Sequence, residues 1–161
     1  GFFLTKSMSL HHDYTTAMLG LIIGIVCMEF LSYIIHRFIM HGFLWNIHKT
    51  HHKHGKNFFE LNDVFSLFFA LVSMCLSIVG YTNGDYFLFG IGFGIIIYGF
   101  LYFFIHDILI HKRVKISIHT KNRYIQHIIH AHKIHHSTID KFPSQSFGLL
   151  WVPYKYRKNR G

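Results

Sequence analysis

Ten of the sixteen histidines occur in two spaced motifs, HxxxxH followed by HxxHH, and this pair of motifs occurs twice. Imidazole is a common metal ligand and is mostly neutral at pH 7, because its ordinary pKa lies near 6.5. On an α-helix, positions i, i+3 and i+4 share one face, so each HxxHH motif presents three imidazoles together. The motifs predict a metal site whose candidate ligands are His36, His41, His48, His51, His52, His106, His111, His132, His135 and His136.

The number of imidazoles predicts two ions. Shared between two ions, ten histidines give about five each, more than the four ligands of a closed structural zinc site. Positions i and i+5 of an α-helix point about 140° apart, so we expect the two members of each HxxxxH pair to serve different ions. Imidazole suits iron, copper, nickel and zinc, so the residues by themselves do not name the metal.

Two acids lie close to these motifs. Glu29 precedes His36 by two helical turns on nearly the same face, and Asp107 adjoins His106. Either carboxylate could accept a hydrogen bond from a ligand imidazole, although Asp107 could equally lie at a solvated helix end. The six histidines outside the motifs are interpreted as interfacial or structural residues, with the last two of them able to support the site: His11, His12, His54, His119, His127 and His130.

Three apolar segments must position the motifs, at 17–35, 64–80 and 86–105. Each is about long enough to cross a hydrocarbon core of roughly 30 Å as a helix. Soluble core helices are the alternative, but the second and third segments carry no charged residue, and only 14% of the chain is charged. With a mean hydropathy of +0.30, the sequence predicts an all-α integral membrane protein, one domain over 1–161 with about three transmembrane helices.

The connections between these segments are also predictable. The Asn-Gly pair in 81–85 indicates a tight turn that makes a hairpin of the second and third segments. Residues 1–14 are expected to form a tail outside the first span. The spacing of Gly90 and Gly94 favours close helix packing.

The basic residues are distributed unevenly along the chain. Of sixteen Lys and Arg residues, only Lys6 precedes the first span, and the other fifteen lie on the side of the membrane that carries the motifs. By the positive-inside rule that side is cytoplasmic, so we predict a cytoplasmic histidine-rich cap that binds two metal ions. The net charge of +9 then reflects topology and contact with lipid headgroups, and no nucleic acid is expected as a partner.

The motifs and their flanking segments resemble the fatty acid hydroxylase and sterol desaturase superfamily of membrane di-iron oxygenases. Within it, residues 28–153 are similar to the bacterial β-carotene hydroxylases. The resemblance rests on HRFIMH, HKTHH, FFELND at 58–63, YGFLYFFIHDILIH at 98–111, HKIHH and SFGLLWVP at 146–153.

The resemblance implies an O₂-dependent β-carotene 3-hydroxylase of the cell membrane, which converts β-carotene through cryptoxanthin to zeaxanthin. It implies two iron ions held by the ten motif histidines, a carotenoid substrate from the bilayer and a ferredoxin or similar electron donor. Zinc can replace iron in a purified sample, because imidazole binds both. The resemblance further suggests that one ion is surrounded by His41, His48, His51, His106 and His132, and the other by His36, His52, His111, His135 and His136.

Two alternatives stay open from the sequence. The first is another membrane di-iron oxygenase, such as a fatty acid hydroxylase or a carotenoid ketolase. The second is a metal transporter or metal-binding membrane protein with histidine-rich loops. A transporter is expected to carry polar residues along its spans, where this chain has only Glu29.

Overall fold

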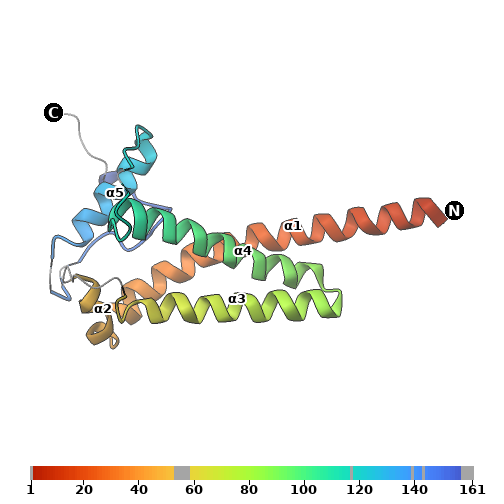
Figure 1. The fold of residues 1–161 in the computed structure, drawn as a ribbon, viewed down its shortest axis with the longest axis horizontal. Helices are drawn as coiled ribbons and strands as arrows, with labels where there is room; N and C mark the ends of the chain where they lie inside the picture. Colours follow the sequence, from red (N-terminus) through yellow and green to blue (C-terminus); the bar gives the residue numbers. More distant parts are fainter. Residues whose placement is uncertain (1, 53–58, 117, 139, 143, 157–161) are drawn as a thin grey trace. The chain divides into compact units, whose positions relative to one another are not determined.

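The computed structural model describes residues 2–52, 59–116, 118–138, 140–142 and 144–156, with side chains from His11 onward. These residues contain helices and no strand, which confirms the all-α prediction (Figure 1). The elements are α1 (Phe2–Ile34), the π-helix η1 (Ile35–Met40), α2 (Trp45–His52), α3 (Asp63–Asn83), α4 (Tyr86–Tyr102), the π-helix η2 (Phe103–Ile110), α5 (Arg123–His135) and the 3₁₀ turn η3 (Tyr154–Tyr156).

Three helical stretches in the described chain are long and apolar enough to cross a bilayer: His11–Met40, Asp63–Asn83 and Tyr86–Ile110. Each contains one of the predicted spans and extends it by several residues. The first and third run from an α-helix into a π-helix without interruption. The prediction of three membrane-spanning helices is therefore confirmed by length and composition.

Two predicted connections are corrected. Helix α1 begins at Phe2, so residues 2–14 continue the first helix instead of forming a separate tail. Helix α3 runs through Asn83, so the turn between α3 and α4 is shorter than predicted (Figure 1). Gly84 makes this turn with a left-handed φ of 69°, and the Asp85 carboxylate accepts the Leu88 N–H at 3.0 Å.

The chain divides into two compact units. Unit 1 comprises Gly1–Met28 and Phe65–Phe100, and unit 2 comprises Glu29–Val64 and Leu101–Gly161. Unit 1 holds most of the three long helices, and unit 2 holds both π-helices, α2, α5 and all four histidine motifs. The organisation as a single domain stays a prediction.

Unit 1 is packed through its glycines. A Cβ added at Gly90 would lie 2.1 Å from the Ala17 carbonyl oxygen, and one at Gly94 would lie 2.4 Å from the Leu21 carbonyl oxygen. No side chain fits at these distances, so the backbones of α1 and α4 are in direct contact. The predicted role of the Gly90-xxx-Gly94 spacing is confirmed.

Helix α5 begins at a capping residue. The Asn122 side chain accepts the backbone N–H groups of Tyr124 and Ile125, which are otherwise unsatisfied in the first turn. This cap fixes where the helix starts and hence which face carries the second HxxHH motif. Ile128 and Ala131 are buried on the same helix, so its apolar face packs inward together with the ligand candidates.

Candidate metal centre

In both HxxxxH motifs the first histidine lies in a π-helix and the second caps the end of that helix. The His41 N–H donates to the His36 carbonyl at 3.0 Å, and the His111 N–H donates to the His106 carbonyl at 2.9 Å. A π-helix closes each turn with an i→i+5 hydrogen bond, so residues five apart lie on one face. The prediction that the two members of each pair serve different ions assumed an α-helix, and the structure shows that this assumption is wrong, because each pair lies in one cluster of candidate ligands.

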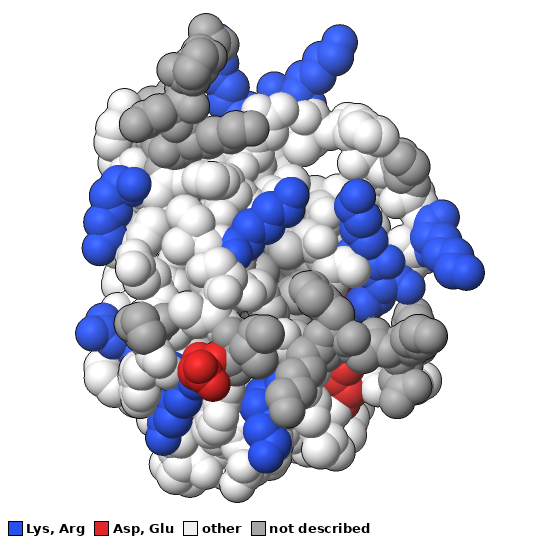
Figure 2. Space-filling view, turned by 90° about the vertical axis from the view of Figure 1, so that its left-hand side faces the viewer, with Lys and Arg blue, Asp and Glu red and all other residues white. Residues whose placement is uncertain are grey.

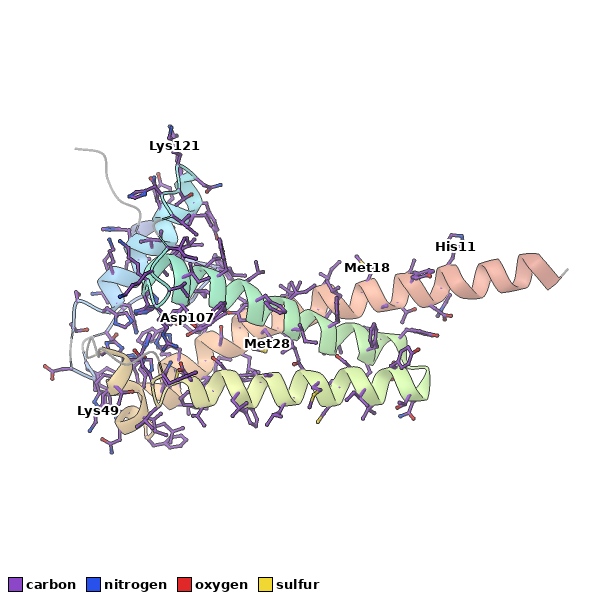
Figure 3. The ribbon with its side chains drawn as sticks, in the orientation of Figure 1. His11, Met18, Met28, Lys49, Asp107 and Lys121 are labelled. Carbon is purple, nitrogen blue, oxygen red and sulfur yellow. The ribbon has the colours of Figure 1, made fainter. Side chains whose placement is uncertain are left out.

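The imidazoles form two clusters within unit 2, and Asp107, labelled in Figure 3, contacts one of them through His106. The candidate ligand nitrogens of each cluster lie within 4.8 Å of one another. Cluster 1 consists of His36, His41, His48, His52 and His135, and cluster 2 consists of His51, His106, His111 and His132. The tenth imidazole, His136, contacts both, with ring centroids 4.4 Å from His52 and 4.7 Å from His111.

This grouping corrects the predicted division of ligands. His36 shares a cluster with His41, and His106 shares one with His111, because the π-helices place each pair on one face. The predicted separation of His51 from His52 is confirmed. Each HxxHH motif contributes to both clusters, as predicted.

In each cluster the Nε2 atoms of neighbouring imidazoles face one another, and their spacing fits a metal ion. Facing Nε2 atoms are 3.1 Å apart in His36–His48, His51–His106 and His111–His132, and 3.2 Å apart in His41–His135. A metal–imidazole bond is about 2.0–2.1 Å long, so neighbouring ligand nitrogens on one ion are about 2.9–3.4 Å apart. The two clusters therefore have the dimensions of two metal sites.

In cluster 1 the outer nitrogen of each imidazole, Nδ1, carries the proton. In cluster 1, Nδ1 donates to an oxygen that can only accept, at distances of 2.8–3.1 Å: the carbonyls of Phe147, Lys141, Thr138 and Gln145, and the amide oxygen of Asn62. With the proton on Nδ1, each Nε2 directs a lone pair inward. Two facing lone pairs cannot hydrogen-bond each other, so a cation between them is the arrangement that this donor set fits.

Burial keeps these imidazoles neutral. It lowers the pKa of His48 to about 3 and the pKa of His52 to about 4, although hydrogen bonds from their outer nitrogens oppose the shift. Burial also lowers the pKa of His51 and His132 well below the ordinary value, and neighbouring imidazoles add to the effect. Neutral imidazole is the form that binds a metal, so these four histidines are in the metal-binding form at neutral pH.

Cluster 2 is supported by a carboxylate network. His51 Nδ1 donates to Glu60 and His106 Nδ1 donates to Asp107, both at 2.8 Å. Arg113 donates to Glu60 at 3.0 Å and to Asp63 at 2.8 Å, and its Nε lies 3.7 Å from Asp107. Burial raises the pKa of Glu60, while Arg113 opposes the shift. The interpretation of Asp107 as an acceptor for a ligand imidazole is confirmed.

Sequence reasoning assigned no role to Glu60, Asn62 or Arg113. The sequence offered one signal for Glu60 and Asn62, because both closely follow the HKTHH motif. Acids are also rare in this chain, which has only seven. Part of the FFELND segment, Phe58, lies outside the described residues, as does His54. The other described histidines outside the motifs belong to neither cluster, as predicted; His127 lies 3.3 Å from the Val152 carbonyl.

Glu29 anchors a distant segment. Its Oε1 accepts the backbone N–H groups of Leu149, Leu150 and Trp151 at 2.8–3.2 Å. A direct role in orienting an imidazole stays a prediction. The structure shows Glu29 holding the segment in which the Phe147 carbonyl accepts the His36 Nδ1–H.

A cavity of about 500 Å³ lies beside cluster 1. Aromatic rings supply much of its lining, which includes Phe30, Tyr33, Phe147, Trp151 and Tyr156, together with the guanidinium of Arg37. The Phe147 ring separates the cavity from the cluster, with its centroid 5.1–5.5 Å from those of three imidazoles, His36, His41 and His135. An apolar ligand in the cavity would lie one ring away from cluster 1.

Comparison with known proteins shows the family to which the chain belongs. The sequence profile of the fatty acid hydroxylase family matches residues 21–153, and the chain belongs to this family. Among its relatives, the β-carotene hydroxylase of Pseudescherichia vulneris is 38% identical over 131 residues, which cover 81% of this chain and 74% of the relative. The predicted resemblance is confirmed.

Two further relatives show how far the similarity extends. The β-carotene hydroxylase of Paracoccus sp. (strain N81106 / MBIC 01143) is 34% identical over 86% of this chain and 85% of its own length. The chloroplastic β-carotene 3-hydroxylase 2 of Arabidopsis thaliana is 38% identical over 80% of this chain and 43% of its own length. No solved structure matches the chain.

Proposed function

We propose that this protein is an O₂-dependent β-carotene 3-hydroxylase that oxidises carotenoid β-rings at a di-iron centre. The observation that carries the proposal is the pair of imidazole clusters with inward lone pairs, in a chain whose relatives are named β-carotene hydroxylases. One ion would be held by cluster 1 and one by cluster 2, with His136 completing the set of ten ligands. In this proposal the two units form one membrane domain.

The chain's residues hold the ions and exclude water from them. When bound, a pair of iron ions supplies the redox chemistry that activates O₂. One oxygen atom enters a ring C–H bond and the other leaves as water, so two electrons and two protons must be delivered. His41 and His135 have no exposed surface, which protects the reaction from solvent.

The cavity beside cluster 1 is suited to the substrate ring. β-Carotene is apolar and dissolves in the bilayer, and the cavity is lined partly by Phe30 and Tyr33 from the first membrane-spanning helix. Trp151→Ala removes one wall and should reduce turnover about tenfold without loss of metal. Tyr154→Ala, which changes a neighbouring residue that does not line the cavity, is the matched control and should leave turnover unchanged.

The electron donor in this proposal is a ferredoxin or similar acidic carrier. Lys and Arg side chains are scattered over the face that Figure 2 shows, where they are far more frequent than Asp and Glu. A basic face attracts an acidic partner and speeds its association at low ionic strength. In this proposal the chain lies in the cell membrane, and by the positive-inside rule this face lies in the cytoplasm, where a soluble donor can reach it.

Expression in bacteria that accumulate β-carotene tests the activity. We expect cryptoxanthin and zeaxanthin in the pigment extract of cells with the wild-type chain, and unchanged β-carotene with His135→Ala. Keto-carotenoids would indicate a ketolase, and hydroxylated fatty acids without hydroxylated carotenoids would indicate a fatty acid hydroxylase. Either of these outcomes would overturn the proposed function.

A further inference from the structure

The two clusters differ in the charge behind their imidazoles. Cluster 1 donates its five Nδ1–H groups to neutral oxygens, among them Asn62 Oδ1 at 2.8 Å from His48. Cluster 2 donates from His51 to Glu60 and from His106 to Asp107, also at 2.8 Å. A carboxylate makes the imidazole a stronger ligand and adds a full negative charge near the ion, whereas a carbonyl adds only a dipole.

Arg113 does not cancel this charge. It pairs with Glu60 and Asp63 and lies near Asp107, so three carboxylates share one guanidinium and a formal charge of −2 remains. The Glu60, Asp107 and Arg113 side chains are only 16%, 11% and 12% exposed. Solvent therefore screens these charges less than it would at the surface.

We propose that cluster 2 is the tighter of the two metal sites, filled first and emptied last, and that Glu60 is a positioning residue that sets this order through His51. The inference rests on the di-metal function proposed above.

A metal titration of the full chain in detergent micelles tests this order. The protein is stripped of metal and titrated with Co²⁺ against a competing chelator, with the Co²⁺ absorption spectrum and metal analysis as readouts. The wild-type chain should bind one ion per chain in a tight step and a second in a weaker step. Glu60→Gln keeps the shape and an acceptor oxygen but removes the charge, and should weaken the tight step about 10- to 100-fold.

Asn62 supplies the matched variants in cluster 1, because it accepts from His48 at the same distance as Glu60 accepts from His51. Asn62→Asp places a carboxylate behind cluster 1 and should tighten the weak step until the two steps approach each other. Asn62→Ala should weaken the weak step and leave the tight step unchanged.

The outcomes separate this inference from the proposed function. Two equal steps in the wild-type chain, or a tight step that responds to Asn62→Ala and not to Glu60→Gln, would overturn the inference and leave a di-metal enzyme. A chain that never binds two ions would overturn the proposed function itself. If Glu60→Gln does not fold, Asn62→Asp still decides, because an unchanged weak step contradicts the inference.

Discussion

Unit 1 and unit 2 are packed by opposite means. In unit 1, glycines bring backbones together: a Cβ at Gly24 would lie 2.6 Å from the Ile91 carbonyl oxygen. In unit 2, the most buried side chains include His41, His48 and His135, each at most 2% exposed. Close backbone contact stabilises a unit without any ligand, whereas buried polar groups stabilise it only when all their partners are present.

The difference shows how one small chain combines a membrane anchor with a reactive centre. The packing of unit 1 needs no ligand, because its contacts are van der Waals contacts between helices. The interior of unit 2 contains imidazole clusters that fit metal cations. A given perturbation should therefore affect one unit and spare the other.

The loss of one imidazole from a cluster should disrupt unit 2 alone. This change has the largest expected effect on activity. His52→Ala removes an imidazole of cluster 1, and hydroxylation should fall below about 1% of the wild-type rate, since even outer partners of metal ligands are worth about 10- to 100-fold. Pigment analysis measures the activity, and membrane extraction shows whether the chain is still inserted. His12→Ala, on an exposed position of α1, should change neither. Full activity in His52→Ala would remove this residue from the ligand set.

Acid should weaken unit 2 in the metal-free protein. Unfolded imidazoles titrate near pH 6.5, whereas burial lowers the pKa of His52 to about 4, of His48 to about 3 and of His135 to about 2. The unfolded chain thus binds more protons below pH 6.5, so stability is full above that pH and is lost as the pH falls toward 4. Glu60, whose pKa is raised by burial, works in the opposite direction but is a single group.

Melting curves of the metal-free chain in micelles measure this loss. The midpoint should fall by at least several degrees between pH 7 and pH 5. With metal bound, the fall should begin at a lower pH, because the ions hold the imidazoles neutral. A midpoint that is constant across this range in the metal-free chain contradicts the burial of neutral imidazoles.

A bulky residue at a helix contact should destabilise unit 1. This change has the smallest expected effect on hydroxylation. Gly94→Leu forces α1 and α4 apart, at an expected cost of about 1–3 kcal/mol in unfolding free energy. Gly99→Leu on the same helix is the control, since a Cβ at Gly99 meets nothing within 4 Å among the described residues. Denaturant titration measures both, and the folded fraction of each variant should retain its metal. Equal stability of the two variants would show that the glycine contact does not hold unit 1.

Sequence reasoning found the spans and the ligand candidates because both signals are local. Apolar length identifies a membrane helix, and regular imidazole spacing identifies a ligand set. The division between the two clusters was not local. His36 and His41 are each held by a carbonyl more than ninety residues away, from Phe147 and Lys141. These contacts accompany a π-helical turn, and the sequence HRFIMH does not predict such a turn.

The carboxylate network was out of reach for a similar reason. Arg113 donates to Glu60, which is 53 residues away in the sequence, and to Asp63, which is 50 residues away. Neither pairing therefore follows from a motif. Asp107 was predictable because its partner, His106, is the adjacent residue. In this chain, sequence reasoning reached hydrogen bonds between neighbours and missed those that depend on how unit 2 folds.

The long separation between partners has a consequence for biosynthesis. His36 and His41 leave the ribosome early, but the carbonyls that hold their outer nitrogens follow 111 and 100 residues later. Cluster 1 also lacks His135 until α5 has been made. The first imidazoles must therefore wait beside the membrane, without a fixed tautomer, until almost all of unit 2 has been translated. A metal ion is therefore expected to enter cluster 1 only late in synthesis, and a chain stalled before α5 would be unable to complete cluster 1.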